Sequence, residues 1–166
     1  RRNGGSGITL LNGVKATITR AVVSGNANPG IYLFGNTPST STVDIADSTV
    51  DGNGYGIFAF STVSTAILKL SVRDSRIVRN SNYGVIAQSN NGAAVSLTAS
   101  NNMVSNNSTG LAAFNAGAKI ISSGNTVTGN AGNGFYNSGG VFESAGNNTV
   151  RDNGANFGTI TVIASQ

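Results

Sequence analysis

The sequence predicts an all-β fold: a parallel β-helix, or solenoid, of about six to seven coils with three short strands per coil. Three observations predict it. Glycines followed by an apolar residue recur at intervals of 23 to 28 residues. An asparagine precedes almost every one of them, and short alternating apolar runs lie between them. A repeat of this length holds about three strands and cannot bury its apolar face alone, so the repeats must stack.

The glycine column comes first, because it marks where each coil bends. A glycine and an apolar residue stand together at Gly7-Ile8, Gly30-Ile31, Gly56-Ile57, Gly84-Val85, Gly110-Leu111 and Gly134-Phe135. Glycine inside a strand pattern is typical of a close approach between backbones. Each pair therefore predicts a tight corner followed by a strand.

An asparagine column runs in step with the glycines. Its members are Asn26, Asn53, Asn80, Asn106, Asn130 and Asn153. Three residues before each is an apolar residue: Val23, Val50, Ile77, Met103, Val127 and Val150. Asparagine tolerates positive φ at sharp corners, and stacked asparagines can hydrogen-bond to one another along an axis. The column therefore predicts a structural asparagine ladder, with the apolar residues facing the core.

The strands between these columns follow from alternation. Apolar residues at every second position span 16–18, 43–45, 68–72 and 95–99. A period of two indicates a strand with one buried face. No run has the 3.6-residue period of a helix, and 23 glycines disfavour helices further.

The repeating phrase resembles the right-handed parallel β-helix repeat proteins of the pectate-lyase-like class. Residues 125–130, Asn-Thr-Val-Thr-Gly-Asn, followed by Gly134-Phe135, carry the resemblance most clearly, and similar phrases cover residues 7–163. The resemblance implies a right-handed, single-stranded helix, as does the handedness rule for parallel crossovers. The chain, residues 1–166, is expected to be a single domain from a longer, secreted or cell-surface protein.

The enzymes of that class cleave acidic polysaccharides, but their signatures are absent. The Asn-Thr-Asp, Asp-Asp and Gly-His-Gly motifs of polygalacturonase-type enzymes and the Arg-x-Pro-x-x-Arg motif of pectate lyases do not occur. The chain also has no histidine and no cysteine, which excludes the commonest general base and all thiolate chemistry. No catalytic residue is carried over from the class.

The few acidic residues still suggest one candidate site. Arg20, Asp47 and Asp74 each stand six residues before a ladder asparagine, so they should stack on successive coils. Paired carboxylates suit glycoside cleavage or a Ca²⁺ ion, and nearby Arg76 or Arg79 could bind a sugar carboxylate. The alternative is a surface charge ladder with no catalytic role.

The strand after each glycine predicts a second candidate site. If its apolar residues alternate inward, the outward column contains Tyr32, Phe58 and Tyr136, with Ile86 and Ala112 between them. Exposed aromatic rings could stack on sugars or meet a partner. A segment of a longer parent chain that covers the column is the alternative.

The charged residues exclude other partners. They make up only 10% of the chain, and Lys15, Lys69 and Lys119 are far apart in the sequence, so no nucleic-acid stripe is predicted. No apolar run reaches the roughly 18 residues of a membrane span.

Together these features predict a non-catalytic scaffold or binding module, with polysaccharide as the candidate ligand and no cofactor required. The alternative is a polysaccharide lyase or glycoside hydrolase acting on acidic glycans, in which Ca²⁺ would be the cofactor. A homo-oligomer through the rod ends or the aromatic column is a further hypothesis, because solenoid ends expose unpaired strand edges.

Overall fold

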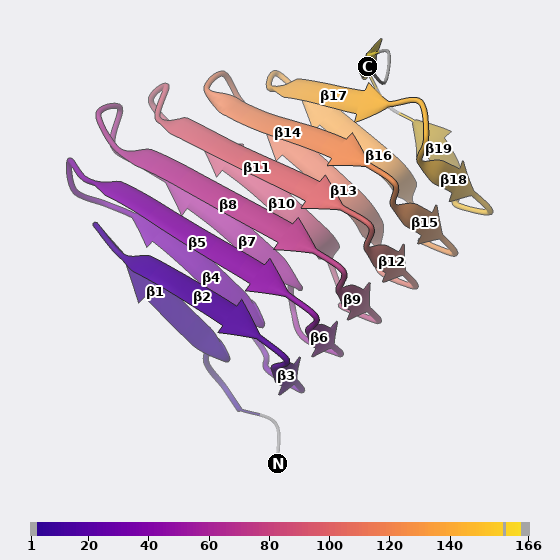
Figure 1. Cartoon of the computed structure of the whole chain (residues 1–166), viewed down its shortest axis with the longest axis horizontal. Coiled ribbons are helices and arrows are strands. Elements are labelled where there is room, and N and C mark those ends of the chain that lie inside the picture. The colour runs from indigo at the N-terminus through magenta and orange to yellow at the C-terminus, as the bar shows by residue number, and fades with distance from the viewer. Residues whose placement is uncertain (1–2, 158, 164–166) are drawn as a thin grey trace.

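The computed structural model describes residues 3–157 and 159–163 of the 166-residue chain. These residues form 20 strands, and no helix occurs among them. Figure 1 shows the strands stacked side by side in parallel rows, with β1 and β19 at opposite ends of one row. The fold is a parallel β-solenoid, as the repeats predict.

Three parallel sheets form the walls of the solenoid. The first contains seven strands: β1 (Ile8–Leu11), β4 (Ile31–Gly35), β7 (Ile57–Ser61), β10 (Tyr83–Ser89), β13 (Thr109–Phe114), β16 (Asn133–Ser138) and β19 (Ala155–Phe157). The second also contains seven: β2 (Lys15–Thr19), β5 (Thr40–Ala46), β8 (Ile67–Arg73), β11 (Ala94–Ser100), β14 (Ala118–Ser123), β17 (Val141–Ala145) and β20 (Thr161–Ile163). The third contains six strands of three residues each: β3 (Val22–Ser24), β6 (Thr49–Asp51), β9 (Arg76–Val78), β12 (Met103–Ser105), β15 (Thr126–Thr128) and β18 (Thr149–Arg151).

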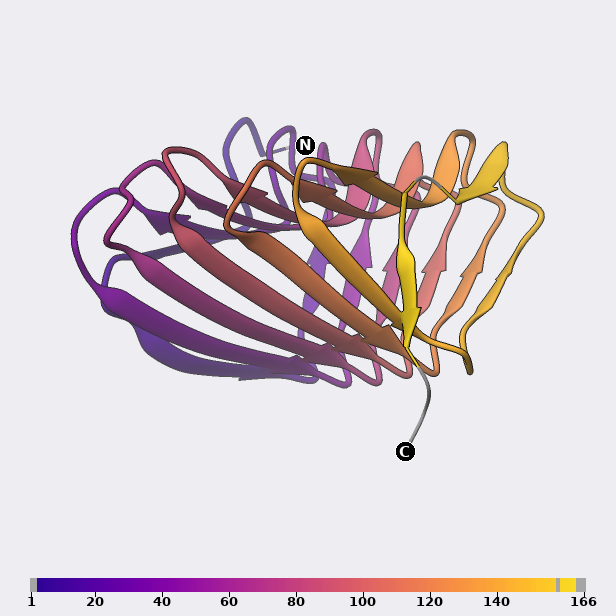
Figure 2. The same cartoon turned by 90° about the horizontal axis from the view of Figure 1, so that it is seen from above.

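Each coil contributes one strand to each sheet. Six coils are complete, from β1–β3 to β16–β18, and β19 and β20 belong to a seventh. The view from above in Figure 2 shows every coil turning in the same sense around a common interior. The prediction of six to seven coils with three strands each is therefore confirmed.

Side-chain alternation fills that interior. Within β5, Val43 and Ile45 are fully buried while Asp44 between them is exposed. The same parity in neighbouring coils stacks Val43 on Leu70 and Ile45 on Val72, because these residues are register partners. The core is thus a set of apolar rows running along the solenoid axis, and each row is continued by the next coil.

The glycine column lies at the corner before the first sheet. A Cβ atom built on Gly30 would come within 2.7 Å of both Asn53 Nδ2 and Val50 Cγ1, closer than real Cβ contacts allow. The close approach expected from the sequence is therefore present. Substituting a larger residue would push the asparagine and valine of the next coil apart.

One row of the predicted core is shifted by a residue in the fourth coil. Met103 points outward and is 46% exposed, whereas Val104 is buried and pairs in register with Ile77 and Val127. The assignment of Met103 to the core was wrong. The inward row at this position is Val23, Val50, Ile77, Val104 and Val127.

Candidate binding faces and the corners that support them

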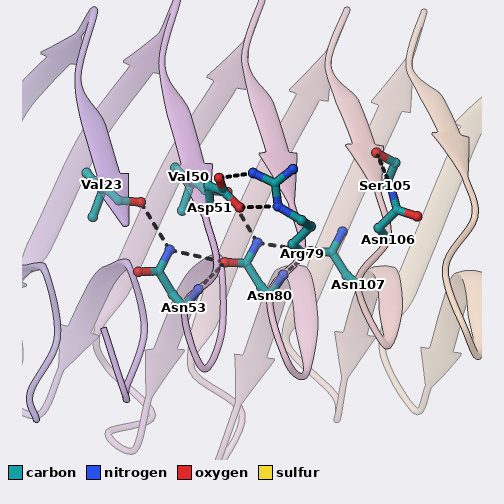
Figure 3. A network of polar contacts seen from close by, with 9 residues as sticks. All are labelled: Val23, Val50, Asp51, Asn53, Arg79, Asn80, Ser105, Asn106 and Asn107. Carbon is teal, nitrogen blue, oxygen red and sulfur yellow. Dashed lines mark hydrogen bonds and ion pairs between the residues drawn. The ribbon is translucent and has the colours of Figure 1, made fainter. Parts of the chain in front are cut away.

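The asparagine ladder lies at the corner between the third sheet and the next coil. Asn53 donates from Nδ2 to Asn80 Oδ1 (3.1 Å), and Asn80 donates in the same way to Asn107 Oδ1 (2.9 Å). The same oxygens also accept the backbone N–H of the preceding ladder residue at 3.0 Å. Figure 3 shows these side chains in one line across successive coils. The ladder ties neighbouring coils together through buried amides.

In the fourth coil the ladder residue is Asn107, and the assignment of Asn106 was wrong. Asn107 donates to Asn130 Oδ1 (3.1 Å) and to the Ile77 carbonyl (3.2 Å), continuing the line from Asn80. Asn106 lies outside the line, with its amide 3.4 Å from Ser105 Oγ (Figure 3). The observed ladder therefore contains Asn26, Asn53, Asn80, Asn107, Asn130 and Asn153.

The left-handed backbone of this corner belongs to the residue before each ladder asparagine. Gly52 has φ 64°, Arg79 has φ 53° and Asn106 has φ 56°. The ladder asparagines have no such φ among the described residues. Their role is hydrogen bonding, so the positive φ expected of them falls one position earlier, and it explains why Asn106 is there.

A second ladder, which was not predicted from the sequence, lies at the corner between the second and third sheets. The Ser48 N–H donates to Ser75 Oγ (3.1 Å), and the Ser75 N–H donates to Asn102 Oδ1 (3.0 Å). Asn102 then donates to Asn125 Oδ1, and Asn125 to Asn148 Oδ1. The repeat of 23 residues from Asn102 to Asn125 to Asn148 was the available signal.

The predicted charge column occupies the positive-φ position of this second corner. Arg20, Asp47 and Asp74 have φ values of 51°, 50° and 51°, and each stands directly before a residue of the second ladder or its first-coil counterpart, Ala21. Aspartate tolerates this conformation better than most residues. Backbone geometry therefore gives one reason for aspartate at these two positions.

Only part of the predicted charged site comes together. Asp47, Asp74 and Arg76 line one shallow surface hollow with Ser48, Ser75 and Asn101. Asp74 is exposed and pairs with Arg73 at 3.2 Å. Arg79 instead pairs with Asp51 of the preceding coil, with Nε 2.9 Å from Oδ1 (Figure 3). No cluster of three or more acidic residues that could hold a metal ion occurs among residues 3–157 and 159–163.

The aromatic column lies on the outer side of the first sheet, in the register that the sequence predicts. Tyr32 pairs with Phe58, and the row continues through Ile86 and Ala112 to Tyr136. A second outward row, two residues along each strand, contains Phe34, Phe60 and Phe114. Tyr55 joins them from the corner before β7, and Tyr83 joins them from the first position of β10. We call these eight residues the aromatic face: Tyr32, Phe34, Tyr55, Phe58, Phe60, Tyr83, Phe114 and Tyr136.

The rings of the aromatic face contact one another without a break. Tyr32 stacks on Phe34 of its own strand, and the Tyr32 and Phe58 rings meet across the coil boundary, with centroids 5.4 Å apart in both pairs. Tyr55 and Tyr83 (6.1 Å) link this group to Phe114 and Tyr136 in later coils. Eight of the chain's 11 aromatic residues thus form one surface on one sheet.

A sequence profile described as a right-handed β-helix region matches residues 1–155. The chain belongs to the right-handed β-helix family. No curated protein and no solved structure matches the chain significantly. The described residues contain no helix that is long and apolar enough to cross a membrane.

The rings of this β-helix also cover the outer surface beneath them. Ile86 is only 2% exposed and Ala112 is fully buried, although both point outward from the sheet. All eight rings remain half-buried rather than hidden. Burial raises the pKa of Tyr32. Burial is also the main cause of the raised pKa of Tyr83, and electrostatic interaction with Tyr136 and Tyr55 raises it further. Both hydroxyls therefore stay neutral near pH 7.

Three of these eight rings, Tyr32, Phe58 and Tyr136, were predicted from the sequence. Phe34 and Phe60 could have been found, because they stand two residues after Tyr32 and Phe58 and must share their face. Phe114 follows Ala112 by the same rule. Tyr55 lies at a corner, where no strand period applies, and Tyr83 is the first residue of β10, three positions before Ile86 and so out of step with the outward row. Only the structure shows that these two rings belong to the surface.

Proposed function

We propose that this β-helix is a non-catalytic binding module whose aromatic face binds polysaccharide. The observation that carries the proposal is the continuous set of eight half-buried rings on the outside of one sheet. An extensive apolar surface on a polar, charge-poor protein is typical of an interaction site. Scaffold and binding roles suit the fold in general, and the ligand class is the proposed part.

The chemistry of the face fits a sugar chain. A pyranose ring presents an apolar side of C–H groups, which packs on aromatic rings, and hydroxyls at its edge. Four tyrosines add hydroxyl groups to this face. These hydroxyl groups form no hydrogen bond with any residue that the structure describes. Tyrosine is well suited to such a mixed surface, since its body is apolar and its tip is polar.

The dimensions also fit an extended ligand. The face runs from the second coil, at Tyr32, to the sixth, at Tyr136. Coils stack about 4.8 Å apart, so the rings extend over roughly 20 Å of the axis. Hydrogen-bonded sheets make this platform rigid, which lowers the entropy cost of binding. A secreted or cell-surface location accords with such a ligand and with the Asn-, Ser- and Thr-rich surface.

The proposal is tested by removing rings that lie outside the core. In a Tyr32→Ala/Phe58→Ala double variant we expect glycan affinity to fall about five- to 150-fold, because each aromatic contact contributes about 0.5–1.5 kcal/mol. The measurement is a glycan array followed by titration calorimetry on the glycans that bind the native chain.

A matched control removes exposed apolar side chains from another sheet. Val22 and Met103 are 77% and 46% exposed on the third sheet, so Val22→Ala/Met103→Ala should leave glycan binding unchanged. Circular dichroism of both variants checks the fold. Glycan signals that survive the loss of Tyr32 and Phe58 would refute the aromatic face as the binding surface.

A further inference from the structure

We infer that the second sheet carries a separate binding face for a linear acidic polysaccharide with sparse charges, laid along a row of lysines. The inference goes beyond the proposed function, because it concerns a different sheet and a charged ligand. It rests on Lys15, Lys69 and Lys119, which are the only lysines of the chain. We call their line on the second sheet the lysine row.

Strand register brings these distant residues into line. Lys15 of β2 pairs with Thr42, and Thr42 pairs with Lys69 of β8. Lys69 pairs with Ser96, and Ser96 with Lys119 of β14. The lysines therefore occupy every second coil, about 9.6 Å apart for coils that stack at about 4.8 Å. The whole row spans about 19 Å.

The surface around the row is polar and hollowed. One hollow is lined by Lys15, Thr17, Thr42 and Asp44. An adjoining hollow shares Thr42 and Asp44 and continues past Lys69; its further polar lining residues are Ser71, Ser96 and Thr98. Hydroxyl groups and ammonium groups therefore alternate along a shallow trough, which suits a ligand that carries both hydroxyls and anions.

The lysines are available to a ligand to different degrees. Lys15 and Lys69 are exposed, and neither has an acidic group within 4.0 Å in the part of the chain that the structure describes. Lys119 is paired with Glu143 at 2.9 Å. Two of the three ammonium groups thus have no acidic partner among the described residues. A ligand anion would share the third, on Lys119, with Glu143 or displace Glu143 from it.

The other charged groups of this face favour a sparse polyanion. Arg73 lies at the edge of the face and pairs with Asp74. Asp44 lies on the outer face of the second coil, between the coils of Lys15 and Lys69. If every unit of the polymer carried a negative charge, one of these charges would face the Asp44 carboxylate and be repelled by it. A polymer charged on alternate units can pass Asp44 with a neutral unit.

Charge spacing also disfavours nucleic acid as the occupant. Each strand of a duplex carries a phosphate about every 3.4 Å, much denser than lysines about 9.6 Å apart. Nucleic-acid surfaces also use more cations than this face carries. The face therefore fits an acidic polysaccharide in which uronate units alternate with neutral sugars.

The first test removes the lysines. The probe is hyaluronan, in which uronate and neutral N-acetylated units alternate, titrated at low salt by calorimetry. We expect Lys15→Gln/Lys69→Gln/Lys119→Gln to weaken binding roughly tenfold or more, because each exposed ion contact contributes about two- to fivefold. The control for a Lys15→Gln/Lys69→Gln double variant is Arg20→Asn/Arg151→Gln, which removes the same two charges at exposed sites outside the lysine row. An equal loss in the control would mean that net charge, not the row, attracts the polymer, and would overturn the inference.

The second test changes the spacing without changing the charge. Thr42 lies between Lys15 and Lys69 in the row, so Thr42→Lys/Lys69→Gln keeps three lysines but breaks the two-coil interval. We expect hyaluronan affinity to fall several-fold, while a fully charged polygalacturonate does not lose affinity. Unchanged hyaluronan affinity would refute the spacing argument, as would absence of hyaluronan binding to the native chain. Tighter, lysine-dependent binding of a single-stranded oligonucleotide would reassign the row to nucleic acid.

The two proposed faces are distinguishable in the same assays. Tyr32→Ala/Phe58→Ala should leave hyaluronan binding intact, because the rings lie on the first sheet and the lysines on the second. Loss of hyaluronan binding in the ring variant would show that the polymer binds the aromatic face, and the lysine row would lose its support. If binding to one face is refuted, binding to the other face can therefore still be tested with its own variants.

Discussion

The two ladder corners of each coil differ in the side chains that close them. The corner after the third sheet has asparagine in every coil from Asn26 to Asn153, whereas the corner after the second sheet has Ser48 and Ser75 before it changes to Asn102. At both corners a backbone N–H of one coil donates to a side-chain oxygen of the next. Each corner therefore requires one side-chain oxygen that accepts the backbone N–H of the preceding coil.

Asparagine adds bonds that serine cannot make. Ser75 Oγ donates within its own coil, to the Arg73 carbonyl at 2.8 Å. Asn102 Nδ2 instead donates to the Val72 carbonyl of the preceding coil (2.9 Å) and to Asn125 of the following coil (3.0 Å). Serine therefore closes a corner, whereas asparagine also joins three successive coils.

The largest expected effect breaks the asparagine corner. Asn107→Ala leaves the buried N–H and amide of Asn80 without their acceptor, because both donate to Asn107 Oδ1. We expect the free energy of unfolding to fall by about 3 kcal/mol, measured by urea denaturation. Asn106→Gly is the matched control, since glycine accepts φ 56° and Asn106 is exposed. If Asn106→Gly were the more damaging change, the ladder would have to be reassigned to Asn106.

An intermediate effect is expected at the serine corner. Ser75→Ala removes the acceptor of the Ser48 N–H and one donor to the Arg73 carbonyl, so unfolding should require about 1–2 kcal/mol less. Ser75→Asn restores an acceptor and should be more stable than Ser75→Ala in the same urea titrations. Equal stability of the two variants would contradict the view that the corner needs a side-chain oxygen.

The smallest effect concerns the residue before the serine. Asp74 has φ 51° and an exposed carboxylate, so Asp74→Asn, which tolerates this backbone, should change stability by less than about 0.5 kcal/mol. Asp74→Val should cost about 1 kcal/mol, because a branched side chain is strained there. Thermal denaturation of the two variants separates backbone from charge. A large loss in Asp74→Asn would point to a role for the carboxylate itself.

The misplacement of Asn106 shows how far repeat spacing can be trusted. Aligned on the glycines, Asn106 stands four residues before Gly110, as Asn80 stands four before Gly84. The true ladder residue stands only three before, as Asn53 does before Gly56. Corners of three and four residues are both used, so two adjacent asparagines cannot be told apart without the hydrogen bonds.

The sequence by itself determined the coil. Alternating apolar residues, the glycine corners and most of the asparagine ladder are local patterns, and each follows from strand geometry or from the space at a tight corner. The sequence also predicted the surface column of Tyr32 and Phe58, whereas other surface neighbours emerged only from the folded structure. The loops differ in length from coil to coil, so sequence distance does not measure distance along the solenoid. Strand register does, and it brings Lys15, Lys69 and Lys119 into one row. Ring contacts join Tyr55 and Tyr83 to the other rings of the first sheet.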